Sequence, residues 1–233
     1  METLLVVVAA VVASGFAVEL FVGWRRRPRT HALVWTLAMA AYALATWALV
    51  IGLSSGWSET SFKAFYFLGA IANILLLATG SVFLVVGDRA GRRFLVFALV
   101  WIGLGLALVV ISPVSTPIAT DGIPEGSELF GAGPRIIAAV SGAVGTIVLV
   151  GLALYSTVRF WGSNRRLGLG NILIVLGALA PALGGTLTGL GESSALAVSL
   201  LLGALLLWWG YRVASGARGA ATPPSAIDVA EEA

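Results

Sequence analysis

The 233-residue sequence has no cysteine and few charged residues. Charged side chains make up 11% of the chain and hydrophobic ones 59%, whereas soluble domains average about 25% charged and about 45–50% apolar residues. Too few polar side chains are therefore available to cover a water-soluble globule. This composition argues against a soluble enzyme, a disordered chain and a nucleic-acid-binding protein, and it favours an integral membrane protein.

The scarce residue types also exclude several kinds of chemistry. Without cysteine the chain has no disulfide framework, no thiolate metal site and no iron–sulfur cluster. His31 is the only histidine, so a bis-histidine haem or a multi-histidine metal site is excluded. We therefore expect no cofactor and no metal. The long apolar runs hold no lysine for a retinal Schiff base and a single acid, so we predict that the protein is not an enzyme.

Long apolar runs predict the fold. A helix needs about 20 mostly apolar residues to cross roughly 30 Å of hydrocarbon, because lipid offers its backbone no hydrogen-bond partner. We predict that 214–233 is a short disordered cytoplasmic tail. The sequence before it, 1–213, predicts an all-α polytopic membrane protein, a seven-transmembrane helix bundle with spans at about 4–24, 32–53, 64–86, 94–111, 136–158, 167–187 and 195–213.

Basic residues divide the connections between these spans into two sets. All of them except Lys63 and Arg135 lie at the ends of spans 1, 3, 5 and 7, whereas the other connections carry mostly acids. Lysine and arginine are retained on the cytoplasmic side of a membrane. The pattern therefore predicts an N-terminus outside and a C-terminus in the cytoplasm, in a multi-pass protein of the inner (plasma) membrane.

Two polar residues inside the spans are candidate functional groups, because burying them in hydrocarbon is costly. Glu19 is the intramembrane acid, and Arg26 follows it on the same helix face. Its carboxylate either reaches the interface or pairs with a neighbouring arginine. Alternatively it is a buried proton acceptor, or it joins two helices by pairing with His31. Asn73 lies near the middle of span 3 and needs a partner within the bundle, because lipid offers none. It either joins two helices or faces a cavity and orients a ligand.

Three residues of span 2 are predicted to share a cavity with Asn73. Tyr42, Thr46 and Trp47 lie within about one and a half helical turns of one another. Together with Asn73 they form our candidate ligand-binding set.

Small residues and a proline characterise spans 5 and 6. Pro181 removes a backbone hydrogen bond and predicts a kink in span 6, within a run of alanine and glycine. Ala138, Ser141, Gly142 and Gly145 form two overlapping small-residue pairs on span 5. Because small residues let helices approach closely, we predict a close contact between spans 5 and 6.

Three segments carry a resemblance to a known family. They are the basic turn Trp24-Arg25-Arg26-Arg27-Pro28-Arg29, the run Phe62–Gly69 that opens the third span, and the stretch from Arg165 to Pro181. In these the chain resembles the seven-transmembrane sensor region of bacterial histidine kinases and diguanylate cyclases, and it is similar to stand-alone bacterial membrane proteins with a Gly-Trp before the third span. No kinase or cyclase domain follows span 7, so the resemblance implies signalling through a separate partner protein.

We therefore predict a sensor-like or ligand-binding module for a small apolar or amphiphilic ligand. The pocket is expected in the outer half of the bundle, beneath the long connection 112–135. One alternative is a structural or assembly subunit of a larger membrane complex, favoured by the many small residues and few polar ones. A second alternative is a small-molecule transporter, which needs a site at the midplane.

Overall fold

The computed structural model describes residues 2–115, 118, 122–188 and 193–219, and within them it contains helices and no strand. Seven helical segments are long and apolar enough to span a membrane, which confirms the predicted all-α bundle. The helices are α1 (Glu2–Arg26), α2 (Thr30–Ser55), α3 (Glu59–Tyr66), the π-helix η1 (Phe67–Ala72), α4 (Asn73–Val85), α5 (Asp88–Ile111), α6 (Gly126–Leu129), α7 (Ala132–Phe160), α8 (Arg165–Thr188) and α9 (Ser193–Gly219).

Two of these boundaries differ from the predicted ones in an informative way. The third span consists of α3, η1 and α4 in direct succession, so one continuous helical segment changes its winding partway. The last helix continues to Gly219, so residues 214–219 are helical instead of disordered. The remainder of the predicted tail, 220–233, lies outside the described residues.

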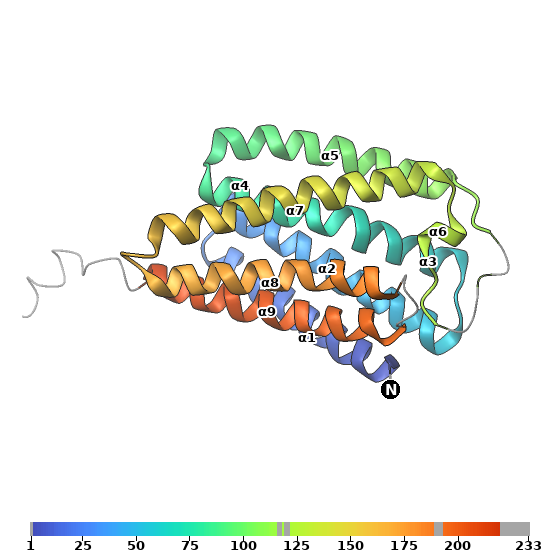
Figure 1. The fold of residues 1–233 in the computed structure, drawn as a ribbon. Coiled ribbons are helices and arrows are strands. Elements are labelled where there is room, and N and C mark those ends of the chain that lie inside the picture. Colours follow the sequence, from blue (N-terminus) through green and yellow to red (C-terminus); the bar gives the residue numbers. More distant parts are fainter. Residues whose placement is uncertain (1, 116–117, 119–121, 189–192, 220–233) are drawn as a thin grey trace, which may run out of the picture.

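The two ends of the bundle carry different turns (Figure 1) and differ in charge. One end, which we call the arginine end, carries the turns after α1, α4 and α7, with Arg25–Arg27, Arg89 and Arg165 among their residues. The other, which we call the α6 end, carries the α2–α3 turn and the long connection between α5 and α7 that contains α6. Gly87, with φ of 107°, forms the tight turn between α4 and α5, a conformation that favours glycine.

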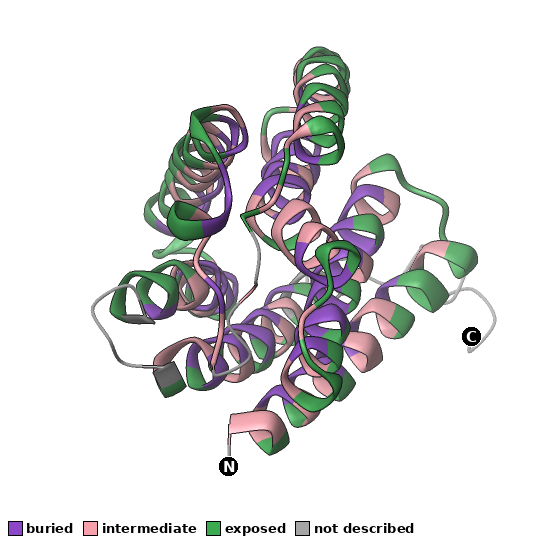
Figure 2. Ribbon diagram, turned by 90° about the vertical axis from the view of Figure 1, so that its right-hand side faces the viewer, coloured by how far each residue is buried: buried purple, intermediate pink, exposed green. Residues whose placement is uncertain are grey.

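The helices share one main core and a smaller one beside it. The main core joins α1, α2, α4, α8 and α9 through fully buried side chains such as Phe16, Met39, Leu77 and Leu207. The smaller core lies at the α6 end and joins α3, η1, α5, α6 and α7. Viewed from that end, the buried sides of the helices face one another and the exposed sides face outward (Figure 2). An apolar exterior of this kind suits lipid.

Glycines repeated every seven residues bring α8 and α9 into backbone contact. Gly170, Gly177 and Gly184 lie on one face of α8, because seven residues make almost two full turns. A methyl group added at Gly170 would lie 2.7 Å from the backbone nitrogen of Ala214, and one at Gly177 would lie 2.7 Å from that of Leu207. The backbone atoms of a regular helix cannot shift locally to make room for such a methyl group. The glycines therefore set how closely this pair packs.

The predicted contact between spans 5 and 6 forms, but not through the small residues of α7 that we expected to make it. The small residues of α7 face other helices: Gly145 packs on Ile74 of α4, and Ser141 accepts a hydrogen bond from Trp101 of α5 at 3.1 Å. Helices α7 and α8 do meet near the arginine end, where Asn171 donates to Ser156 at 2.8 Å. Close packing needs small residues on both facing surfaces, and the glycine face of α8 is turned to α9.

Two glycines of α8 should respond oppositely to alanine. We expect Gly177→Ala to lower stability by about 1–3 kcal/mol, because the new methyl group meets the α9 backbone. Gly185→Ala meets nothing within 4 Å and should be neutral or stabilise by up to about 1 kcal/mol through helix propensity. Thermal unfolding in detergent measures both. Equal midpoints for the two variants would contradict the backbone contact.

The charge asymmetry predicts that the two ends of the bundle lie on opposite sides of a membrane. Ser127 in α6 and Ser163 in the α7–α8 turn are both exposed and stand at opposite ends. Since the chain has no cysteine, Ser127→Cys and Ser163→Cys each create a unique thiol. We expect an impermeant maleimide added to intact spheroplasts to label position 127 but not position 163. Labelling of both from the same side would overturn the orientation.

Candidate functional site

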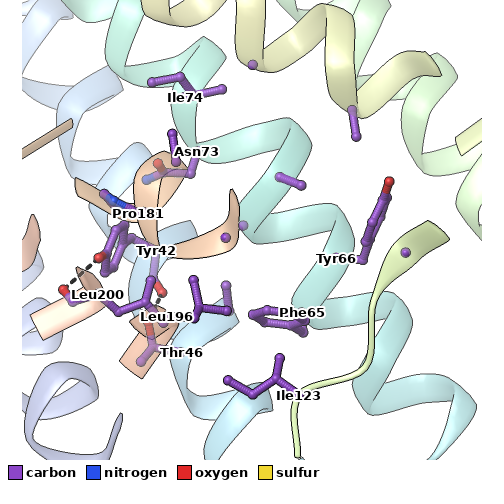
Figure 3. Close-up of a pocket in the computed structure, with 18 of the residues that line it drawn as sticks. Tyr42, Thr46, Phe65, Tyr66, Asn73, Ile74, Ile123, Pro181, Leu196 and Leu200 are labelled. Carbon is purple, nitrogen blue, oxygen red and sulfur yellow. Dashed lines mark hydrogen bonds between the residues drawn. The ribbon is translucent and has the colours of Figure 1, made fainter. Parts of the chain in front are cut away.

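A cavity of about 450 Å³ lies in the half of the bundle next to the α6 end. Ligand pockets in proteins commonly measure about 300–1,000 Å³, so its volume suits a small organic molecule. Every long helix except α1 and α5 contributes to its wall, and the segment 123–127 covers it from the α6 end. Tyr42, Asn73 and Pro181 lie together on one side of it and Tyr66 on the other (Figure 3).

The polar side chains of the cavity use their donors on backbone carbonyls. The Tyr42 hydroxyl donates to the carbonyl of Leu200 on α9 at 2.8 Å. Thr46 donates to the carbonyl of Tyr42 at 2.8 Å, and Asn73 Nδ2 donates to the carbonyl of Ala38 on α2 at 2.9 Å. Each bond satisfies a donor that hydrocarbon could not. The wall is therefore largely apolar toward the space that it encloses.

Polar atoms on the wall that remain available to a ligand include one on α4 and one on α7. The carbonyl oxygen of Asn73 accepts no hydrogen bond from the described residues, although the residue is 93% buried. The hydroxyl of Thr146 on α7 likewise has no partner among them. One acceptor and one hydroxyl, set in an apolar wall, suit a ligand with at most a single small polar group in this region.

The π-helix η1 forms part of this wall just before Asn73. Gly69 and Ala70 of η1 line the cavity, and Asn73 begins α4 at the point where α-helical winding resumes. A π-turn inserts one extra residue into a helix and often occurs at functional sites. Here the extra residue changes the angle around the helix axis between Tyr66 of α3 and Asn73 of α4, so that both side chains line the same cavity.

The connection before α7 forms a cover over the α6 end of the cavity. Phe130 is buried, with its ring 5.2 Å from that of Phe62 and 5.0 Å from that of Tyr66. The Trp57 indole donates to the carbonyl of Gly122 at 3.1 Å. Gly126 lies directly on the Tyr66 ring, where a methyl group would overlap it. These contacts hold 122–130 against the bundle, so the cover is packed and not loose.

Three members of the predicted ligand-binding set meet at this cavity, and one does not. Tyr42, Thr46 and Asn73 line it together, as does Pro181, which lies within the continuous helix α8. Trp47 lies outside the cavity: its indole donates to Ser14 of α1 at 3.1 Å. The prediction that Trp47 shares the cavity is wrong, because one residue along a helix turns the side chain by about 100°. What the other three bind stays a prediction.

Glu19 lies outside the cavity, and its hydrogen bonds join the first helix to the last. Its Oε2 accepts from Trp208 Nε1 at 2.7 Å and from Arg212 Nη2 at 2.7 Å. The arginine also lies over the Trp208 ring, 5.4 Å from its centroid. This is the arginine pairing considered from the sequence, with Arg212 of α9 in place of Arg26. His31 lines a smaller cavity at the arginine end.

Sequence reasoning missed two residues near the cavity. Thr146 gives no distinguishing signal in the sequence, because single hydroxyls are common in transmembrane helices and usually bond to their own backbone. Arg135 contributed to the charge pattern, but no side-chain role was predicted for it. It lines a shallow depression that shares Tyr66, Gly126 and Ala138 with the cavity wall. The signal that could have identified it is a basic residue, one of two with Lys63, at the otherwise acidic end of the bundle.

Comparison with protein-family models, curated proteins and solved structures found no match for this chain. Within the part of the chain that the structure describes, no group of three or more histidine, cysteine, aspartate or glutamate residues is arranged to hold a metal ion. The acid Asp121 of the α5–α7 connection lies outside that part. The cavity itself therefore carries the functional argument.

Shortening the buried aromatic ring of the cover should loosen it. We expect Phe130→Ala to raise backbone hydrogen exchange in 122–130, because truncating a buried phenylalanine costs about 3–5 kcal/mol of local packing. Phe130→Leu, which keeps most of the apolar volume, should change exchange much less. Exchange in α8 serves as the internal reference. An unchanged exchange rate in the alanine variant would mean that the cover is held by other contacts.

Proposed function

We propose that this protein is a seven-helix ligand-binding membrane module of the sensor-like kind, for a small apolar or amphiphilic ligand. The observation that carries the proposal is the cavity of about 450 Å³, whose wall is largely apolar and in which Tyr42 and Asn73 donate to backbone carbonyls. An apolar space of this size offers water few hydrogen-bond partners, so an apolar molecule is the better occupant. Binding and not catalysis is proposed, since the wall brings no acid, base and nucleophile together.

The way the cavity divides the bundle supports a sensing role. Its wall includes α4 and α7 on one side and α8 and α9 on the other. A molecule that fills the cavity contacts both sides at once and favours one spacing between them. A ligand shifts the equilibrium between two conformations of a protein only if it binds one of them more tightly, and a preferred spacing meets that condition. We propose that the change passes to a separate partner protein at the arginine end, in the cytoplasm of a bacterial cell.

Transport is less well supported than binding. The smaller cavity, near His31, Trp35 and Asn171, lies toward the arginine end and shares no lining residue with the larger one. Buried side chains such as Leu149 and Ile174 belong to the packed core around it. A permeation route would need these two spaces to join. The described residues therefore support a binding site that does not continue across the bundle.

Filling the cavity should abolish binding of a small amphiphile. The probe is a photoactivatable diazirine analogue of octanol, and the readout is mass-spectrometric mapping of labelled residues. We expect saturable labelling of Leu77, which lines the cavity and is 2% exposed. Ala70→Trp and Thr146→Trp, from two walls, should each weaken labelling by roughly tenfold because the indole occupies the space.

The matched control is Ala107→Trp, which adds the same ring to the exposed surface of α5. In this variant we expect the probe to label Leu77 to the same extent as in the unmodified protein. Absence of saturable Leu77 labelling in the unmodified protein, with labels confined to the outer surface, would sink the proposed binding function.

A further inference from the structure

Helices α7 and α8 separate as they approach the α6 end. They are joined at the arginine end, where Thr157 lies 3.4 Å from the carbonyl of Gly168, and they stand apart at the other end (Figure 1). The larger cavity occupies the region where they are apart, since both helices line it. Ala182 and Gly185 line the cavity and are exposed, so the space reaches the surface of the bundle on this side.

Glycines on the two sides of this opening differ from the packing glycines of the same helices. A methyl group at Gly142 of α7 or at Gly185 of α8 would meet no atom within 4 Å. One at Gly145 or Gly177 would meet Ile74 or the α9 backbone at 2.8 and 2.7 Å. Gly142 and Gly185 are therefore not required for helix packing. They leave the opening between α7 and α8 unobstructed.

The opening faces the side of the bundle that touches lipid, whereas the α6 end is covered. Exposed alanines of α7 and α8 flank it, and the segment 122–130 is packed over the cavity by Phe130 and Trp57. An apolar molecule dissolved in the bilayer reaches the opening without crossing water. The same molecule in water would have to displace the cover, which contributes buried aromatic contacts.

A basic side chain stands beside the α6 end of this route. Arg135 is exposed, forms no ion pair with the described residues, and lines a depression that adjoins the cavity at Tyr66, Gly126 and Ala138. It lies in the first turn of α7, where a cation is unfavourable to the helix dipole, so helix stability does not account for it. Glu125 lines the cavity instead, and its carboxylate accepts from Ser127 at 2.8 Å.

We propose that the cavity takes one acyl chain of an anionic membrane lipid, which enters sideways between α7 and α8 while Arg135 holds the headgroup phosphate. This inference rests on the proposed function and names its ligand class and its route. The apolar wall suits a hydrocarbon chain, and the guanidinium supplies charge-assisted hydrogen bonds to a phosphate at the membrane surface. The lipid thereby bridges the interface and the bundle interior.

The test uses the full chain in phosphatidylcholine vesicles that contain a trace of phosphatidylglycerol with a diazirine at the end of one acyl chain. Labelling of Leu77 and Leu207 is the readout, because both line the cavity and are at most 2% exposed. The double variant Gly142→Leu, Gly185→Leu fills the opening, and we expect it to lower this labelling by roughly tenfold or more. Gly151→Leu, at another unobstructed glycine of α7 outside the cavity, should leave it unchanged.

Arg135→Gln tests the headgroup part separately. We expect it to lower labelling by the phosphatidylglycerol probe by roughly tenfold. A phosphatidylcholine probe with the same chain should lose less, because its choline cation offsets the phosphate charge, so that the preference for phosphatidylglycerol disappears. Equal labelling by both lipids in the unmodified protein would overturn the role of Arg135. The thermal midpoint of each variant, compared with that of Gly151→Leu, checks that the fold is retained.

The outcomes separate this inference from the proposed function. If the octanol analogue labels Leu77 but neither lipid does, the lipid ligand is wrong and the binding module stands. If the lipids label Leu77 equally well in the double leucine variant, the route between α7 and α8 is wrong. If no probe labels Leu77, both proposals fall together.

Discussion

The structure depends on one constraint: within hydrocarbon every polar group must find its partner in the protein. The helices satisfy their own backbones, and Tyr42, Thr46 and Asn73 follow the same rule by donating to helix carbonyls. Tyr42 and Asn73 each join α2 to another helix in this way. Because these donors are already bonded, the cavity beside them presents an apolar wall. The chemistry of the site therefore follows from the same requirement that determines the fold.

Glycine has two different roles in this bundle, and the difference explains where the cavity lies. At Gly170 and Gly177 the missing side chain lets the backbones of α8 and α9 touch. At Gly142 and Gly185 it leaves space that nothing fills. Helix α8 is thus drawn to α9 on one face, and its distance from α7 grows toward the α6 end. The cavity occupies the volume that this asymmetric packing leaves open.

The sequence predicted the seven spans well, because their length and hydrophobicity are properties of single segments. It also brought Tyr42, Thr46 and Asn73 together, since polar residues in lipid-spanning helices must face the interior. It did not predict the partner of Glu19 or the pairing of α8 with α9, because small residues show which face packs but not against which helix. The prediction for Trp47 was wrong for a related reason. Neighbouring residues on a helix point in different directions, and spacing alone does not say which of them faces inward.

The bonds of Glu19 have a consequence for biogenesis. Its partners Trp208 and Arg212 are contributed by α9, 193 residues beyond it in the case of the arginine. Ribosomes deliver α1 to the bilayer long before α9 exists. During that interval the carboxylate has no partner from the last helix, and only completion of the seventh segment joins the two ends of the chain. The pair therefore forms only in molecules in which α9 has been synthesised, and not in shorter translation intermediates.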